Sequence, residues 1–438
     1  MPDTMTSSLL LDAREICKTY STAADRTGRL VLDHINFQLK EGEIVAILGK
    51  SGSGKSTFLR VIAGLTQASE GNVCYRGNPV LAPAQGIAMV FQSFALFPWL
   101  TVLGNVELGL ESQGVPRDER RQRAIAAIDL IGLDGFESAY PKELSGGMRQ
   151  RVGFARALVV NPDILLLDEP FSALDVLTAE TLRGDLAELW TQRRVPTKGI
   201  VFVSHNIEEA VEMADRILVF SSDPGRIRAE MPVPLPRPRD HAHPVFRQIV
   251  DEVYTQLTTI PGREPTKRGG AAPSIGIAYH LPPASIQQLI ALMDTLTWEP
   301  YNGRADLPHL ADTLSLSPDD LFPLIEALQI LGFAQVGGGD IEAAPAGKAL
   351  SDADMLKRKQ IFAEHLMRFV PLVAHIRKVL DERPNHTAPS ARFLGELEDH
   401  LSENDAEEVF DTVINWARYA ELFAYDYDSG VLSLENPA

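Results

Sequence analysis

Short apolar runs alternate with amphipathic stretches in the first half of the chain. Residues 9–48 alternate between polar and apolar positions and end in the run EIVAILG; GIAMVF, DILLLDE, GIVFVSH and RILVF follow. Runs of this length are typical of buried strands. Strands separated by helical segments predict an α/β domain with a mixed, largely parallel sheet that continues to about Phe220.

The pattern changes after this sheet. Prolines accumulate between Asp223 and Arg239, the helical stretch PVFRQIVDEVYTQLTT follows, and GREPTKRGGAAPS is typical of an exposed linker. The remainder is mostly helical in pattern. We therefore expect an N-terminal domain at 1–260 with a helical subdomain at about 95–160, a linker at 261–275 and a C-terminal domain at 276–438.

Composition separates the last third from the rest. The 438 residues are 45% apolar and 23% charged, which is ordinary for a globular protein with two or three cores. Cys17 and Cys74 are too few for a disulfide framework or a zinc site, so we expect a reducing compartment. No stretch approaches the roughly 18 apolar residues of a membrane span, so we expect a soluble protein. Residues 271–438 hold 11 Lys and Arg against 26 Asp and Glu, which accounts for nearly all of the net charge of -18.

A glycine-rich segment, GKSGSGKST, lies between the apolar strand EIVAILG and the helical stretch STFLRVIAGL. It satisfies the phosphate-loop pattern in the strand–loop–helix context that the pattern requires. Its backbone N–H groups and the helix start favour a phosphate, Lys55 can reach the β- and γ-phosphates, and Ser56 can hold Mg²⁺. The residues expected to bind the nucleotide here are Gly49, Ser51, Gly52, Gly54, Lys55, Ser56 and Thr57.

The segment ILLLDEP supplies two acids at the end of a buried strand, where ligands of such sheets lie. Asp168 is expected to bind Mg²⁺, and Glu169 is expected to polarise the attacking water as a catalytic base. Two adjacent acids after a strand are, by themselves, common as helix N-caps. Their position beside a phosphate loop favours the catalytic interpretation.

A second phosphate-like helix start lies in LSGGMRQRVGFARAL, Leu144–Leu158. Ser145 can cap this helix, and Gly146 and Gly147 remove the Cβ atoms that would block a phosphate. The segment has no lysine, so its own affinity for phosphate would be low. Such a site makes sense where it contacts a nucleotide that is already held elsewhere.

GKSGSGKST, LSGGMRQR, ILLLDEP, SALD and VSHN, in this arrangement, resemble the ATP-binding-cassette (ABC) ATPases over about residues 9–260. The LSGGMRQ segment is the most discriminating, because other phosphate-loop ATPases lack it. The resemblance implies that two copies pair head to tail. Ser145, Gly146 and Gly147 of each copy would then close over the γ-phosphate of the ATP held by the other.

The same resemblance implies roles for four further residues. Gln92 would touch Mg²⁺ and the attacking water, His205 would contact the γ-phosphate, Tyr20 would stack on adenine, and Asp175 would couple the two sites. Without the resemblance, Gln92 would be an ordinary loop residue, His205 a helix cap and Tyr20 a core residue. The family's usual aspartate after the histidine is Asn206 here.

The stretch SFALFPWLTVLGNVELGLE is too apolar for an ordinary solvated loop. About Gln92–Leu100 it looks like the segment that receives a transmembrane permease subunit; the alternative is a local core under the helical subdomain. Together with HNIEEAVEMADRILVF it is similar to the nitrate, sulfonate and taurine importers. That resemblance implies two separate permeases, an indirect role for an external solute-binding protein, and a peripheral location on the cytoplasmic face of the inner membrane.

The acidic last third shows a helix–turn–helix–hairpin pattern over residues 305–350, in which Ser317, Asp319 and Asp320 start the second helix. This pattern predicts a winged helix. Residues 393–435 repeat it, which predicts a tandem pair. In that alignment Leu310, Leu314, Leu321 and Phe322 correspond to Leu397, Leu401, Val409 and Phe410.

Winged helices often bind DNA, which requires clusters of lysine and arginine. The second helices carry acids instead, and within this third Lys357–Lys359 is a single short basic cluster that we expect on a solvated helix face. We therefore expect no nucleic-acid partner and a regulatory or protein-docking role. The region also resembles the C-terminal extension of some nitrate- and sulfonate-type ATPases. The alternative is a soluble ABC ATPase that acts on nucleic acid or a protein complex through this domain.

Overall fold

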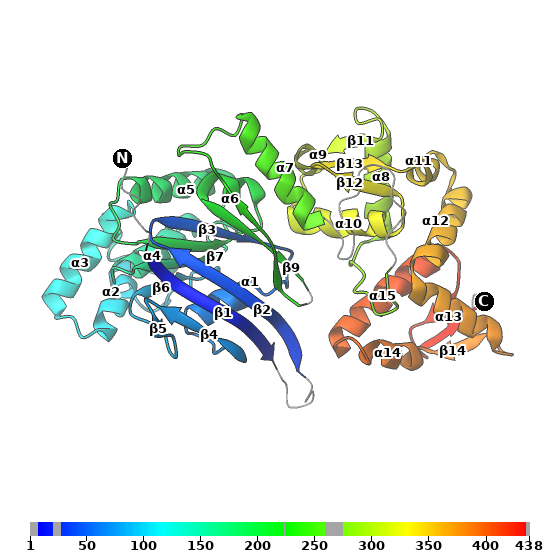
Figure 1. Cartoon of the computed structure of the whole chain (residues 1–438), viewed down its shortest axis with the longest axis horizontal. Coiled ribbons are helices and arrows are strands. Elements are labelled where there is room, and N and C mark those ends of the chain that lie inside the picture. Colours follow the sequence, from blue (N-terminus) through cyan, green and yellow to red (C-terminus); the bar gives the residue numbers. More distant parts are fainter. Residues whose placement is uncertain (1–7, 21–27, 223, 259–274, 435–438) are drawn as a thin grey trace. The chain divides into compact units, whose positions relative to one another are not determined.

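The computed structural model describes residues 8–20, 28–222, 224–258 and 275–434 (Figure 1). The chain divides into two compact units, Met1–Val250 and Asp251–Ala438. The boundary falls inside helix α7 (Pro244–Thr258). The linker expected at 261–275 lies outside the described residues, apart from Ile275. Among the described residues, no helix combines the length and hydropathy needed to cross a bilayer.

The first unit is built on a six-stranded sheet whose strands are parallel except for one edge. The five apolar runs of the sequence each form a strand of it, as predicted. The antiparallel edge strand, RIRAEMP, was not predicted because it is polar and only partly buried. In order across the sheet the strands are β10 (Arg226–Pro232), β9 (Arg216–Ser221), β3 (Glu43–Leu48), β8 (Gly199–Val203), β7 (Ile164–Asp168) and β6 (Ile87–Val90).

A second, antiparallel sheet covers the helix that follows β3. Leu10, Ile16 and Phe37 of this sheet pack in one core with Phe58 of α1 (Lys55–Ile62) and Val45 of β3. Because this core surrounds the start of α1, it fixes the phosphate loop between β3 and α1. The strand order is β2 (Arg29–Lys40), β1 (Leu9–Tyr20), β4 (Glu70–Tyr75) and β5 (Asn78–Pro79).

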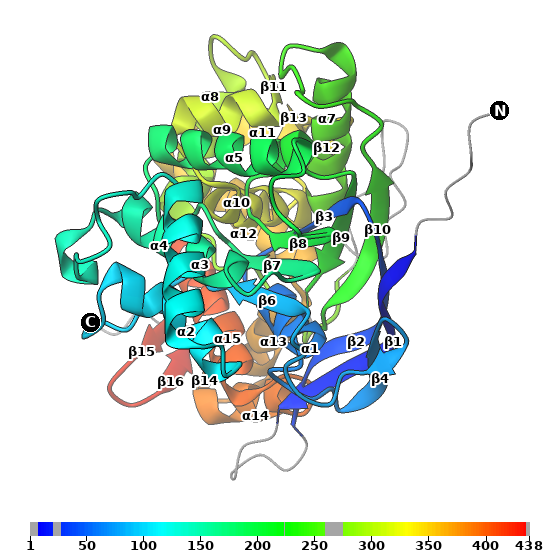
Figure 2. The same ribbon diagram turned by 90° about the vertical axis from the view of Figure 1, so that its left-hand side faces the viewer.

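Helices α2, α3 and α4 form a helical layer beside the sheets (Figure 2). Their bounds are α2 (Val102–Ser112), α3 (Arg117–Leu130) and α4 (Gly146–Leu158), with a 3-10 turn at Pro141–Glu143. Two further helices leave the carboxyl edge of the central sheet, α5 (Val176–Thr191) after β7 and α6 (Ile207–Met213) after β8. The mixed sheet and the helical layer agree with the predicted ABC-type fold.

The second unit contains the same element order twice: helix, strand, two helices, then a two-stranded hairpin. Each copy closes a three-stranded antiparallel sheet in which the first strand pairs with the last. The first copy comprises α8 (Ile286–Thr297), β11 (Arg304–Asp306), α9 (Leu307–Leu314), α10 (Pro318–Ile330), β12 (Ala334–Gly337) and β13 (Asp340–Ala343). After α11 (Pro345–Asp352) and α12 (Met355–Phe369), the second comprises α13 (Pro371–Glu382), β14 (Thr387–Pro389), α14 (Ser390–Glu398), α15 (Glu403–Tyr419), β15 (Ala424–Asp426) and β16 (Val431–Ser433).

The two copies match in detail, but not in the register expected from sequence. Ala305 pairs with Ile341 in the first sheet as Ala388 pairs with Leu432 in the second. When the two copies are aligned on these strands, Leu310 corresponds to Phe393 and Leu314 corresponds to Leu397. The sequence had predicted Leu397 and Leu401 as their partners, which lie one helical turn later. An apolar pattern of helical period fits nearly as well when it is shifted by a turn, so it could not fix the register.

Candidate functional site

The phosphate loop holds its lysine inside the fold. The Lys55 side chain is buried, and its Nζ donates to the carbonyl oxygens of Gly49 (2.7 Å) and Lys50 (2.8 Å). Helix α1 begins at this residue, so its free N–H groups face the same loop. A cation and a helix start at one place form a site for an anionic phosphate.

Packing favours glycine at Gly49 and Gly54, and a positive φ favours it at Gly52 (77°) and again at Gly54. A Cβ at Gly49 would lie 2.8 Å from Ser53 Oγ and 3.0 Å from Phe220 Cβ. Gly54 has φ 85°, and a Cβ there would lie 2.7 Å from Leu32 Cδ2. The other predicted positions line the loop without such contacts: Ser51 and Gly52 are exposed, and Ser56 and Thr57 are half-buried in the first turn of α1.

Ser56, in the helix after β3, and Asp168, the last residue of β7, come together at the carboxyl edge of the central sheet. Ser56 Oγ donates to Asp168 Oδ1 at 2.7 Å. Burial is the main cause that raises the pKa of Asp168, although the Ser56 hydroxyl opposes it. A hydroxyl and a carboxylate are the hard oxygen ligands that Mg²⁺ prefers, and a bound Mg²⁺ would offset the burial of the charge. These two side chains therefore fit the predicted metal position.

Two of the predicted residues lie at the Glu169 carboxylate. Gln92 Nε2 donates to Glu169 Oε2 at 2.8 Å, and His205 Nδ1 lies 3.7 Å from the same oxygen. The His205 ring is the largest cause that lowers the pKa of Glu169, so the carboxylate is ionised near neutral pH. The residue has φ 46°, a conformation that non-glycine residues adopt rarely and mostly at functional positions. An ionised carboxylate held this way can orient a water molecule.

The serine–glycine start of α4 lies against the start of α5. Ser145 caps α4 by accepting a hydrogen bond from the Met148 N–H at 3.2 Å. A Cβ at Gly147 would lie 2.3 Å from Thr178 Cγ2, so internal packing requires glycine there. A Cβ at Gly146 would make only an ordinary contact, 3.8 Å from the Ala173 oxygen. Both glycines were expected to give a phosphate access, but the packing within the chain constrains only Gly147.

Asp175 caps α5 and fixes the neighbouring segment. It accepts from the Thr178 N–H at 3.1 Å and from the Thr178 hydroxyl at 2.7 Å, and that hydroxyl is the main cause that lowers its pKa. The next two residues, Val176 and Leu177, are 72% and 75% exposed. These two adjacent aliphatic residues are therefore largely open to solvent beside the Ser145 segment.

Tyr20 ends β1 with its ring 43% exposed, which excludes the core interpretation. It pairs with Arg29 of β2, and two residues further along β2 Val31 reaches the phosphate loop at Gly54. Lys18 Nζ lies 4.8 Å from the centre of the Tyr20 ring. An exposed aromatic ring at this strand end is free to stack on a flat base.

A buried charge cluster behind His205 was missed from the sequence. Glu209 is 5% exposed, and burial raises its pKa to about 7. Arg183 of α5 lies 3.8 Å from Glu209 and 3.6 Å from Glu212. Arg183 and Glu209 border a 260 Å³ cavity that Glu169 and His205 also line. The adjacent acids of HNIEEA looked like ordinary first-turn acids, so only the apolar neighbours of Glu209 could have signalled its burial.

Side chains of the helical layer bind the backbone of the loop at 92–100, while Phe97 and Trp99 are exposed. Arg156 donates to the carbonyl oxygens of Phe94 (2.9 Å) and Ala95 (2.5 Å), and the fully buried Asn105 binds the backbone of Phe97 at both its N–H and its carbonyl. The Phe97 and Trp99 rings lie 5.4 Å apart and are 42% and 69% exposed. The local core begins at Val102, so these two rings do not serve it.

Two family models match the chain. Residues 32–172 match the ABC transporter model, and residues 308–426 match the C-terminal AAA-associated domain model. Similar curated proteins include the nitrate import ATP-binding protein of Synechocystis, which is 43% identical over 55% of this chain and 91% of its own length. The taurine import ATP-binding protein of Rhizobium johnstonii is 48% identical over 47% of this chain and 78% of its own length. The aliphatic sulfonates import ATP-binding protein of Bacillus cereus is 39% identical over 57% of this chain and 96% of its own length.

Each of these relatives matches about half of this chain, whereas the chain covers most of each relative. The matched motifs lie in the first unit, where the phosphate loop, the two acids and the serine–glycine segment were found. The chain therefore belongs to the family of ABC transporter ATP-binding proteins.

Proposed function

We propose that the chain is the ATP-binding and ATP-hydrolysing subunit of an ABC importer that takes up a small anion such as nitrate, a sulfonate or taurine through separate permease subunits. The observation that carries the proposal is the convergence of Gln92 and His205 on one oxygen of Glu169. This cluster directly follows Asp168, which is bonded to the phosphate-loop Ser56. Hydrolysis of a nucleoside triphosphate needs a loop that binds the phosphates, a metal position and an ionised base, and the three lie next to one another here.

Each side chain then has a defined task. Lys55 neutralises the β- and γ-phosphates, and Ser56 and Asp168 hold Mg²⁺ with Gln92 beside it. Bound Mg²⁺ supplies positive charge to the phosphate oxygens as charge develops during hydrolysis. Glu169 accepts a hydrogen bond from the attacking water and aligns it, while His205 donates to the γ-phosphate. Tyr20 stacks on the adenine.

The working unit is a head-to-tail dimer in which Ser145, Gly146 and Gly147 of one copy cover the ATP held by Lys55 of the other. Three observations support this arrangement. The Ser145 segment has no lysine of its own, a Cβ at Gly146 would find room within the chain, and Val176 and Leu177 are exposed beside it. Closure on ATP and reopening after hydrolysis would drive the permease between its two orientations.

The permease binds the outward-facing rings of the 92–100 loop, which places the chain on the cytoplasmic face of the membrane. Gln92, at the start of the same loop, contacts Glu169, so a displacement of the loop reaches the hydrolytic carboxylate directly. The external solute-binding protein acts only through the permease. The second unit, which repeats one element order and is rich in acidic residues, would have a regulatory role. A nucleic-acid role receives no support from charge.

Uptake in cells that lack this chain tests the assignment. Wild-type protein should restore uptake of nitrate, taurine or an alkanesulfonate, and Trp99→Ala should reduce both uptake and retention of the chain by permease-containing membranes. Trp298→Ala, which removes an indole that is 55% exposed in the second unit, is the matched control and should behave as wild type. Restored uptake of none of these anions, with intact ATPase activity, would contradict the importer assignment.

A further inference from the structure

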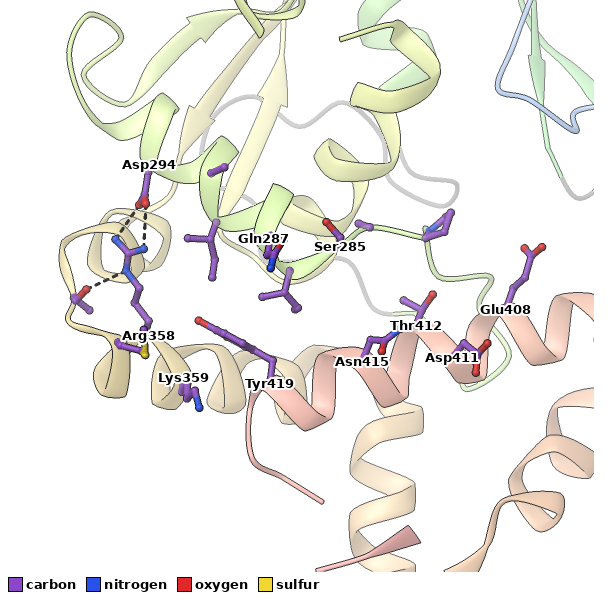
Figure 3. Close-up of a pocket in the computed structure, with 17 residues that line it drawn as sticks. Ser285, Gln287, Asp294, Arg358, Lys359, Glu408, Asp411, Thr412, Asn415 and Tyr419 are labelled. Atoms are coloured by element: carbon purple, nitrogen blue, oxygen red, sulfur yellow. Dashed lines mark hydrogen bonds and ion pairs between the residues drawn. The ribbon is translucent and has the colours of Figure 1, made fainter. Parts of the chain in front are cut away.

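The second unit contains a cavity that the ATPase function does not use. It has a volume of about 1080 Å³ and lies between α8, α12 and α15 (Figure 3). Its walls are largely apolar, with Ile286, Ile290 and Ala291 from α8 and Met355 from α12. A cavity of this size with apolar walls and a few polar groups is typical of sites for small organic ligands.

One end of the cavity presents hydrogen-bond donors. Arg358 binds both oxygens of Asp294 at 3.0 Å and the carbonyl oxygen of Ser351 at 2.6 Å, which holds α12 against α8. Beside it lie the Lys359 ammonium, whose partner is Glu421 at 2.6 Å, and the hydroxyl of Tyr419. Burial is the main cause that raises the pKa of Tyr419, so the hydroxyl keeps its proton. The expectation that Lys357–Lys359 lies on a solvated face is therefore wrong for Arg358 and Lys359.

The opposite end is acidic. Glu408 and Asp411 lie one turn apart on α15, at the other end of the row of labelled residues from Lys359 and Tyr419 (Figure 3). Within the described part of the chain, no ion pair involves Asp411. Glu408 lies 3.6 Å from the His280 ring, and a carboxylate oxygen of Asp405 lies within 4.8 Å of both. Two carboxylates with so little compensation attract a cation.

Neutral polar groups line the space between the two ends. Gln287 of α8 and Thr412 and Asn415 of α15 all border the cavity. Among the hydrogen bonds found for the described residues, none involves these three side chains. They are therefore available to a ligand that lies along α15.

We propose that this cavity binds a linear zwitterion with an apolar middle, its ammonium group at Glu408 and Asp411 and its carboxylate at Lys359 and Tyr419. Asp411 and Tyr419 are eight residues apart on α15, which corresponds to about 12 Å along the helix axis. An ω-amino acid with a long methylene chain spans much of this distance, and so does a free tripeptide, which reaches about 10 Å when extended. Both share the same chemistry of separated opposite charges.

Calorimetric titration of the full-length chain tests the proposal. The probes are ω-aminooctanoate, the tripeptide Ala-Leu-Ala, and two molecules that lack one charge each, octanoate and octylamine. Each zwitterion that fits should bind about tenfold more tightly than either single-charge probe, and the tighter of the two zwitterions identifies the source of the ligand. Absence of binding by both zwitterions at about 10 mM, or equal affinities for all four probes, would overturn the proposal.

Paired variants separate specific contacts from overall charge. Glu408→Gln with Asp411→Asn should weaken binding of the zwitterion about tenfold and leave octanoate binding unchanged. Glu398→Gln with Asp399→Asn removes the same charge from exposed positions at the end of α14 and should change neither. If both double variants weaken binding equally, Glu408 and Asp411 do not bind the ammonium group of the ligand. All four residues are exposed, so neither pair perturbs the core.

Discussion

The two units differ in how their functional residues are held. In the first, the backbone itself forms the site: Gly54 has φ 85°, Glu169 has φ 46°, and Lys55 is bound by carbonyl oxygens of its own loop. In the second, the cavity is made by side chains of three regular helices from distant parts of the sequence. A site that depends on backbone geometry requires particular residue types a few positions apart, so it can be recognised as a sequence motif. A cavity between helices from distant parts of the chain produces no such motif.

The largest expected effect tests whether all hydrolytic chemistry belongs to the first unit. Glu169→Gln should lower ATP turnover by about 10²–10⁴-fold, because it removes the carboxylate that orients the water and keeps its shape. Nucleotide binding should persist, since Lys55 and the loop are unchanged. Steady-state phosphate release and nucleotide titration check both.

Glu398→Gln, an exposed acid of the second unit, is the matched control for that experiment and should keep wild-type turnover. Wild-type turnover in Glu169→Gln would show that another group acts as the base.

The next effect concerns the buried cluster behind His205. The pKa of Glu209 rises from 4.5 in the unfolded chain to about 7 in the fold, so the folded state binds this proton more tightly. The stability that the protonated carboxyl contributes is present in acid and is lost as the pH rises from about 4.5 to about 7. Relative to Glu209→Gln, the wild type should therefore lose roughly 3 kcal/mol of unfolding free energy across this range.

Urea unfolding of both proteins at several pH values measures that difference. Arg183, His205 and Glu212 also face Glu209, and all three are present in the glutamine variant. A difference between the two proteins that does not change with pH would contradict the assignment.

A smaller effect separates the two glycines of the Ser145 segment. Gly147→Ala should destabilise the fold by about 1–3 kcal/mol, because the new methyl group meets Thr178 Cγ2. Thr178→Ser in the same chain removes that methyl group, keeps the bond to Asp175 and should restore stability. Gly146→Ala should leave stability unchanged but reduce turnover, as expected if a partner's phosphate approaches there. Thermal unfolding and turnover of the three variants distinguish these outcomes.

The smallest effect tests whether the two repeats of the second unit are equivalent. Ser317 and Ser402 each accept from the N–H three residues later and donate to the side chain of the same aspartate. Ser317→Ala and Ser402→Ala should each cost about 1 kcal/mol of unfolding free energy. A clear loss for only one of them would show that the repeats share topology but not energetics.

Sequence patterns predicted those parts of the molecule that depend on local rules. The apolar runs predicted five strands. The family resemblance implied that Gln92, Glu169 and His205 act at one site, and the Gln92–Glu169 hydrogen bond agrees with it. The edge strand β10 was missed because its residues are mostly polar.

Long-range side-chain contacts could not be predicted from the sequence. The burial of Glu209 depends on Arg183 from another helix, and the fixed position of Arg358 depends on Asp294, 64 residues away. The positions of these residues along the sequence do not indicate that their side chains are in contact.

The central claim is that one copy's Ser145 completes the nucleotide site that the other copy's Lys55 begins. A crystal structure of Glu169→Gln with ATP and Mg²⁺ tests it most directly. The account predicts a head-to-tail dimer with Ser145 Oγ at hydrogen-bond distance, about 3 Å, from the γ-phosphate bound by Lys55 of the partner subunit. A structure in which Ser145 lies far from every triphosphate would contradict it.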